Sequence, residues 1–167
     1  MWDGVLHMNP PPIEPHMRVG GDLFLALSLA ARAKGLRAYI ETGLFDPKVK
    51  SYKNYRVPDM LVTDPRLATR RGIDGPAELV VEVRSPGDDT DEKLPYYAHL
   101  GVPEVMILNS FPCELEHLRL VRGAYQPVAT PADGWHRVLC VDVALRVIDE
   151  GVAFEMDSPL GLERLEP

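Results

Sequence analysis

The sequence has few of the features that would place it in several common classes of protein. Only two cysteines occur in 167 residues, Cys113 and Cys140, and they form no CxxC pair and no ligand pattern with histidine. Neither a disulfide scaffold nor a zinc site is therefore indicated. No apolar run reaches the length of a membrane span, and no secretory leader opens the chain. We expect a soluble, cytoplasmic protein that does not contact membranes.

Positive charge is also scarce. The chain carries 18 Lys and Arg against 25 Asp and Glu, which gives a net charge of −7 and a pI near 5.2. Such a protein does not adhere to polyanions through its overall charge, so any nucleic-acid contact requires a local basic patch. A phosphate-binding glycine loop, a GxSxG elbow and a Rossmann fingerprint are all missing from the sequence.

The chain does have enough apolar residues to bury a core. Hydrophobic residues make up 46% of it, and 16 prolines and 13 glycines indicate many turns between short elements. We predict an extended proline-rich lead over residues 1–15 and a single α/β or α+β domain over 16–167. Apolar residues at helical spacing predict a first helix from residue 16 or 18 to Lys34, ended by Gly35.

The middle of the chain has the pattern of a parallel crossover unit. The run Leu79–Val83 is nearly continuously apolar, Gly101 ends a helical segment, and a second apolar run follows. The pattern predicts strands over residues 36–45, 57–63, 79–83 and 102–108, with a helix over 91–100 between the last two. Further on it predicts a hairpin of 115–121 with 124–128, short strands near 137–141 and 145–148, and a loose polar C-terminus.

Two acids within apolar strands are the most informative feature. Asp59 and Glu82 would be costly to bury unless a cation, a metal or a hydrogen-bond network compensates them. If their strands pair, both carboxylates converge at one edge of the sheet, an arrangement that suits Mg²⁺ or Mn²⁺. Purely structural alternatives stay open: Asp59 could cap a turn, Glu82 could form a buried salt bridge to Arg84 or Lys93, and Lys93 could be solvated.

A basic, tyrosine-bearing segment over residues 46–56 precedes Asp59, and a polar loop over 64–76 follows it. If the first segment links two antiparallel strands, it is an exposed hairpin end that can reach a phosphate backbone. Solvated loops kept soluble by lysines are the alternative. The candidate nucleic-acid contacts are Lys48, Lys50, Lys53, Arg56, Arg70 and Arg71.

Several stretches of the chain together resemble a known family. They are Pro58-Asp59, Glu82-Val83 with Ser85-Pro86, Asp91 with Lys93, Tyr97, and Gly101-Val102-Pro103-Glu104. In this context the sequence is similar to the Uma2 family, also called DUF820, a branch of the PD-(D/E)XK nuclease-like superfamily whose members are labelled restriction endonucleases. The resemblance covers most of the chain and implies a restriction-endonuclease-like mixed sheet flanked by helices, with additional antiparallel hairpins.

The resemblance also implies roles for individual residues. Asp59 and Glu82 correspond to metal ligands, and the carbonyl of Val83 to a third. The superfamily's lysine stands two residues after the second acid, which is Arg84 here, whereas the Uma2 pattern has it on the next helix, which is Lys93. Arg84 stays protonated and can only hold charge, so Lys93 is the preferred catalytic cation. Asp91 could orient Lys93 or add to the acidic cluster.

Taken together, these features predict a Mg²⁺- or Mn²⁺-dependent endonuclease that cleaves nucleic acid, with DNA as the expected substrate. The alternative is a catalytically inactive nuclease-fold module that binds DNA or protein, which the acidic net charge and the displaced lysine favour. Many superfamily nucleases cut both strands as dimers, and the first helix is strongly apolar, so a homodimer is expected.

Overall fold

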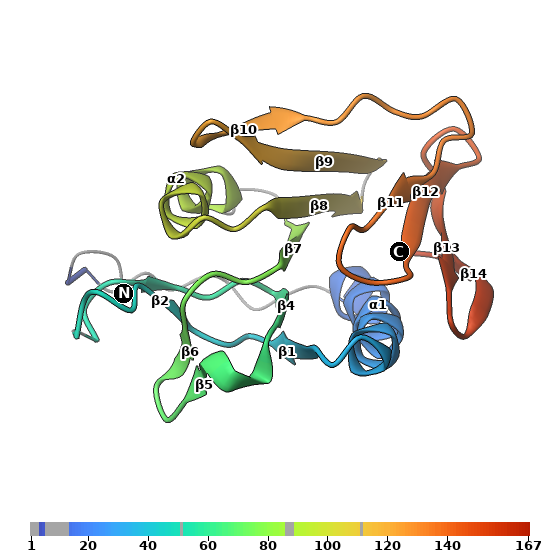
Figure 1. The fold of residues 1–167 in the computed structure, drawn as a ribbon. Coiled ribbons are helices and arrows are strands. Elements are labelled where there is room, and N and C mark those ends of the chain that lie inside the picture. Colours follow the sequence, from blue (N-terminus) through green and yellow to red (C-terminus); the bar gives the residue numbers. More distant parts are fainter. Residues whose placement is uncertain (1–3, 6–13, 51, 86–88, 111) are drawn as a thin grey trace.

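The computed structural model describes residues 4–5, 14–50, 52–85, 89–110 and 112–167, so the predicted lead over 1–15 falls largely outside the described residues. The fold is mixed α+β and is organised around a six-stranded sheet (Figure 1). Its strands, in spatial order, are β1 (Arg37–Ile40), β4 (Met60–Thr63), β7 (Leu79–Arg84), β8 (Glu104–Ser110), β9 (Cys113–Val121) and β10 (Ala124–Pro127). The fold class predicted from the sequence is confirmed.

The predicted crossover lies at the centre of this sheet. Strands β7 and β8 pair in parallel, and helix α2 (Thr90–Leu100) connects them. The helix ends at Gly101, whose φ of 82° is left-handed and whose N–H donates to the carbonyls of Ala98 and Tyr97. The other neighbouring pairs of the sheet are antiparallel, including the predicted β9–β10 hairpin.

Helix α1 (Glu14–Ala33) and a C-terminal sheet cover one face of the central sheet, and α2 covers the other (Figure 1). The strands of the C-terminal sheet, in order, are β11 (His136–Arg137), β12 (Ala144–Ile148), β13 (Ala153–Ser158) and β14 (Gly161–Leu165). Because side chains alternate along a strand, Val81 and Val83 pack in the core with α1, while Val80 packs in the core with Tyr96 and Tyr97 of α2.

A small sheet lies beside α2 and carries the basic segment. Its order is β3 (Tyr55–Arg56), β2 (Leu44–Phe45), β6 (Gly72–Asp74) and β5 (Ala68–Thr69), and the short 3-10 helix η1 (Pro65–Leu67) precedes β5. Strands β2 and β3 pair antiparallel, so the described residues 46–50 and 52–54 connect two antiparallel strands, which is the condition set above for a hairpin end. The Tyr96 hydroxyl donates to the Leu44 carbonyl at 3.2 Å and so joins this sheet to α2.

The structure corrects several predicted boundaries. The continuous strand over 36–45 was wrong, because Glu41 adopts a φ of +45° and the chain turns there, leaving β1 and β2 in different sheets. The C-terminus is not loose, since β13 and β14 form a hairpin. The strand expected from residue 57 begins at Met60, and the first helix begins at Glu14. Within the part of the chain that the structure describes, no helix is long and apolar enough to cross a membrane.

Candidate active site

Asp59 lies immediately before β4, at the point where this strand meets β7. Met60 is paired with Val81, so Asp59 is placed next to Glu82. The Asp59 Oδ2 atom accepts a hydrogen bond from the Val83 N–H at 2.6 Å, and its backbone carbonyl accepts one from the Glu41 N–H at 3.0 Å. The two acids predicted to converge, Asp59 and Glu82, therefore lie side by side where β4 and β7 pair.

Glu82 is 1% exposed and lies on the face of β7 that α2 covers. Its two carboxylate oxygens have different partners, both from α2. Lys93 Nζ donates to Oε2 at 3.0 Å, and the Tyr97 hydroxyl donates to Oε1 at 2.6 Å. The buried salt bridge that was the alternative explanation for Glu82 is thus present, and it belongs to the same cluster as Asp59.

Helical spacing brings the α2 residues to this place. Asp89, Lys93 and Tyr97 are four residues apart, and side chains at this spacing share one face of a helix. Lys93 Nζ also lies 3.5 Å from Asp89 Oδ1, at a distance and angle that make an ion pair rather than a hydrogen bond. The Lys93 ammonium group is therefore ion-paired with Glu82 and Asp89, and the charge of Asp59 also acts on it.

Burial and this surplus of negative charge shift the pKa values of the cluster. Burial raises the pKa of Glu82 to about 7; the charge of Lys93 opposes the rise and that of Asp59 adds to it. Burial alone would lower the pKa of Lys93, but the Glu82 carboxylate more than compensates and the pKa is raised. Burial, with Glu82 beside it, raises the pKa of the Tyr97 hydroxyl well above its usual range, so this group acts as a hydrogen-bond donor.

The donor set fits an oxygen-preferring cation. Among the described residues, no group of three or more His, Cys, Asp and Glu side chains is placed to hold a metal ion. Mg²⁺, however, keeps several waters and is commonly bound by one or two carboxylates. Asp59 and Glu82 offer such a pair, in a cluster with more negative than positive charge. A contribution from the Val83 carbonyl stays a prediction.

Arg84 lies outside this cluster. Its guanidinium donates to Asp91 at 2.6 Å and to Glu116 of β9 at 2.8 Å, and its side chain is 24% exposed. Asp91, expected as a partner for Lys93, is thus paired with Arg84 instead. Lys93 is the cation that contacts Glu82, and Arg84 is already neutralised by two carboxylates.

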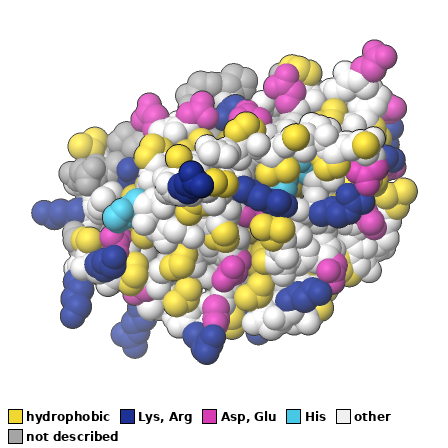
Figure 2. Space-filling view, turned by 45° about the horizontal axis from the view of Figure 1, so that its top comes forward, with side chains coloured by type: hydrophobic (Ala, Val, Ile, Leu, Met, Phe, Trp, Pro, Cys, Tyr) yellow, Lys and Arg dark blue, Asp and Glu magenta, His cyan; other side chains and the backbone are white. Residues whose placement is uncertain are grey.

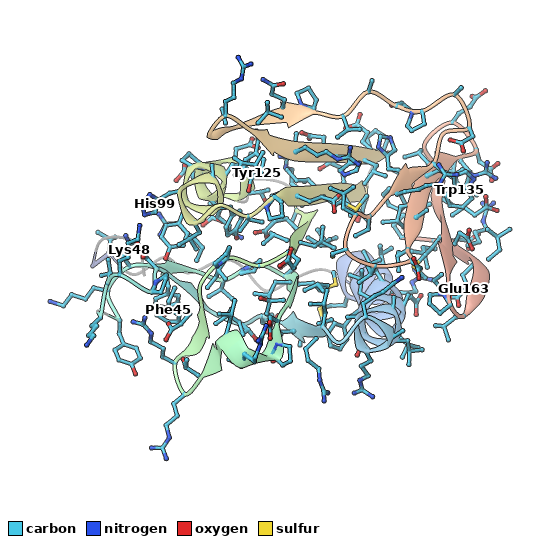
Figure 3. All side chains as sticks on the ribbon, viewed as in Figure 1. Phe45, Lys48, His99, Tyr125, Trp135 and Glu163 are labelled. Atoms are coloured by element: carbon cyan, nitrogen blue, oxygen red, sulfur yellow. The ribbon has the colours of Figure 1, made fainter. Side chains whose placement is uncertain are left out.

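The six basic residues proposed as nucleic-acid contacts fall into two groups. Arg56 and Arg71 are directed into the protein: Arg56 lies over the Tyr96 ring at 4.7 Å, and Arg71 bonds Asp74 at 2.6 Å. The exposed members of the set are Lys48, Lys50, Lys53 and Arg70. In Figure 2, basic side chains project from the left end of the molecule, where Figure 3 places Lys48 on the side of α2.

Tyr97 and Asp89 are the members of the cluster that sequence reasoning missed. Tyr97 was named above only among the residues that carry the resemblance, with no role assigned, and its ring is fully buried among apolar side chains. The available signal was its spacing of four residues from Lys93, which places both side chains on one face of the helix. Only the relative position of α2 and β7 reveals that this face meets Glu82.

A second buried polar cluster lies on the opposite face of the central sheet. Glu104 of β8 is fully buried, and its Oε1 lies 2.6 Å from His117 Nε2 of β9. The His117 Nδ1 atom lies 3.3 Å from Nδ1 of His136 in β11, and Glu104 Oε2 accepts the Leu139 N–H at 2.9 Å. No role was predicted for these histidines, and the cluster joins the central sheet to the C-terminal sheet.

Comparison with known proteins agrees with the fold. The sequence profile of the Uma2 family, described as "Putative restriction endonuclease", matches residues 1–147. The crystal structure of a DUF820 protein from Anabaena variabilis, named a putative nuclease, superposes with a TM-score of 0.64 at 13% identity, covering 82% of this chain and 79% of that one. A DrdV–DNA complex is matched with a TM-score of 0.37 at 18% identity, over 65% of this chain and 9% of that one. No curated protein matches significantly.

Proposed function

We propose that this chain, which belongs to the Uma2 family, is a Mg²⁺- or Mn²⁺-dependent endonuclease that hydrolyses phosphodiester bonds of nucleic acid, with DNA as the expected substrate. The observation that carries the proposal is the convergence of three groups from separate elements. Asp59, Glu82 and Lys93 come from the start of β4, from β7 and from α2, and they meet in one cluster.

Each of these residues has a distinct part in the proposed reaction. Asp59 and Glu82 would hold the metal, whose bound form supplies an activated water and neutralises charge on the phosphate. The raised pKa of Lys93 keeps its amine protonated at neutral pH. Lys93 therefore acts as a fixed positive charge that stabilises the negative charge developing on the phosphate, and not as the base.

The surface supports a polyanionic substrate only locally. Lys48, one of the exposed lysines between β2 and β3, lies on the side of the molecule that carries α2 (Figure 3), while the net charge is −7. We therefore propose that this hairpin contacts the phosphate backbone near the site. A homodimer remains part of the proposal, because two sites allow both strands of a duplex to be cut in one encounter, and light scattering at micromolar concentration checks it.

An inactive nuclease-fold module that binds DNA or protein is the second candidate. Its support is that both oxygens of Glu82 already accept hydrogen bonds, and that Arg84 is neutralised by Asp91 and Glu116. A cluster of this kind can serve the fold without serving a reaction. The two candidates differ in metal binding, because a remnant has no need of an ion between Asp59 and Glu82.

Purified protein is incubated with plasmid, single-stranded DNA and RNA in Mg²⁺ or Mn²⁺, with and without a chelator. We expect metal-dependent cleavage of DNA and a loss of about a hundredfold or more in Glu82→Gln. Glu155→Gln is the matched control: Glu155 is a partly buried, ion-paired acid on the C-terminal sheet, bonded to Arg146 at 2.7 Å. Its cleavage rate should equal that of the wild type.

Equal cleavage by the wild type and Glu82→Gln would identify a contaminating nuclease and refute the proposal. Calorimetric titration with Mn²⁺ separates the two candidates. Millimolar or tighter binding that disappears in Asp59→Asn supports the enzyme, and a wild type that neither binds Mn²⁺ nor cleaves supports the inactive module.

A further inference from the structure

Among the described side chains that hydrogen-bond to Glu82, Tyr97 is the uncharged one. It lies four residues after Lys93 on α2, and its hydroxyl donates to Glu82 Oε1 at 2.6 Å while Lys93 donates to Oε2 at 3.0 Å. The two donors therefore hold the two oxygens of one carboxylate from the same helix. A carboxylate held in this way has a fixed plane, and each of its oxygens keeps a further lone pair for another partner.

We propose that Tyr97 is a positioning residue that fixes the orientation of the Glu82 carboxylate for metal binding. This inference rests on the proposed function. Metal ligands are usually oriented by hydrogen bonds from neighbouring groups, and loss of such a partner typically lowers metal affinity by about 10- to 100-fold. Tyr97 is 0% exposed, so it acts through Glu82 and does not touch the substrate.

A merely structural role predicts a different result. If the Tyr97 hydroxyl only satisfies a buried hydrogen bond, its removal affects folding and leaves the metal site unchanged. Tyr125 provides the matched control, because its partly buried hydroxyl donates to the Val102 carbonyl at 2.8 Å and its ring packs against the same apolar core. It lies on the side of α2 (Figure 3), and its partner belongs to the turn after the helix.

The test compares Tyr97→Phe, Tyr125→Phe and the wild type by calorimetric titration with Mn²⁺, together with thermal unfolding of the metal-free proteins. We expect Tyr97→Phe to bind Mn²⁺ about tenfold or more weakly, and Tyr125→Phe to bind it like the wild type. Equal Mn²⁺ affinity in Tyr97→Phe and the wild type would overturn the inference and leave the proposed function intact. A wild type that binds no Mn²⁺ would overturn both.

A second measurement needs no variant, in case Tyr97→Phe does not fold. Tyrosines in the full chain are replaced by meta-fluorotyrosine, and fluorine NMR follows them during titration with Mg²⁺. The Tyr97 resonance should shift as the ion binds, because its hydroxyl and the ion share one carboxylate, while the Tyr125 resonance stays in place. A Tyr97 resonance that does not move at saturating Mg²⁺ would contradict the proposal.

Discussion

The two buried carboxylates of the central sheet, Glu82 and Glu104, lie on opposite faces and are compensated in different ways. Glu104 is bonded by His117 and the Leu139 N–H, and His117 is in turn bonded to His136. Both Glu104 oxygens have a partner, and this one carboxylate lies beside the imidazoles of His117 and His136 and within 4.0 Å of the Arg119 guanidinium.

Both oxygens of Glu82 are satisfied in their hydrogen bonds, but the described cluster around it holds more carboxylates than cations. Among the described residues, Lys93 is ion-paired with Glu82 and Asp89, and Asp59 adds a third negative charge nearby. The pKa of Glu82 is raised to about 7, because burial and the charge of Asp59 disfavour its ionised form. Electrostatic strain of this kind is common at functional sites, and favourable interactions elsewhere in the protein offset its cost in stability. The two clusters therefore differ in their excess of carboxylates over cations, and this excess at Glu82 is the basis of the proposed cation site.

The largest expected loss of stability follows from removing the Glu104 carboxylate. Glu104→Ala leaves His117 and the Leu139 N–H without their buried acceptor, so we expect the free energy of unfolding to fall by about 3 kcal/mol or more. Asp59→Asn keeps an oxygen for the Val83 N–H and removes a repulsive charge, so we expect stability to stay within about 1 kcal/mol of the wild type or to rise. Urea unfolding at neutral pH measures both, and a comparable loss in both variants would contradict the distinction.

The pH dependence of stability tests the strain at Glu82 directly. A folded pKa of about 7, against 4.5 for an ordinary glutamate, means that the folded state binds this proton more tightly. The resulting stabilisation is complete below about pH 4.5 and is lost as pH rises through about 7. We expect acidification from pH 8 to 5 to raise the unfolding free energy of the wild type over that of Glu82→Gln by up to about 3 kcal/mol. Parallel pH curves for the two proteins would refute the shift.

His136 should respond to acid with the opposite sign, and more weakly. Burial, and then the neighbouring His117, lowers the pKa of His136 from its usual 6.5. The stability that this shift provides is present above pH 6.5 and is lost as pH falls through the folded pKa. Facing the pair are Glu104, which His117 contacts, and Arg119, at 4.0 Å from Glu104. Urea unfolding of His136→Gln and the wild type at pH 7 and pH 5 tests this prediction. The wild type should lose more stability on acidification than the variant does.

The two clusters also differ in how far the sequence could predict them. Asp59 and Glu82 stand out because acids interrupt apolar strands, and the crossover of β7, α2 and β8 follows from the same pattern. Glu104 also lies in an apolar run, but its partners are His117 of β9 and the Leu139 N–H, which follows β11 of the C-terminal sheet. No local pattern encodes that contact, because it depends on how the sheets pack.

The missed elements have local causes of their own. Strands β13 and β14 were interpreted as a loose tail, because polar residues such as Glu155, Asp157 and Glu163 obscure the alternation with buried Phe154 and Met156. One face of this hairpin is exposed, so only about every second residue along a strand is buried. Tyr97 was missed for a related reason, since helical spacing gives its face on α2 but not the carboxylate that this face meets.

Replacing Arg84 should have the smallest effect on stability, and comparing it with a replacement of Lys93 tests which cation acts in the site. The sequence left this choice open between Arg84 and Lys93. The Arg84 pairs with Asp91 and Glu116 are partly exposed, so Arg84→Met should lower the unfolding free energy by about 1 kcal/mol or less. Because Arg84 does not contact Glu82, DNA cleavage should persist, whereas Lys93→Met should lose about a hundredfold or more. Circular dichroism of both variants ensures that folded proteins are compared. Loss of cleavage in a folded Arg84→Met, with cleavage retained in Lys93→Met, would transfer the catalytic charge to Arg84 and show that its carboxylate partners release it when the phosphate binds.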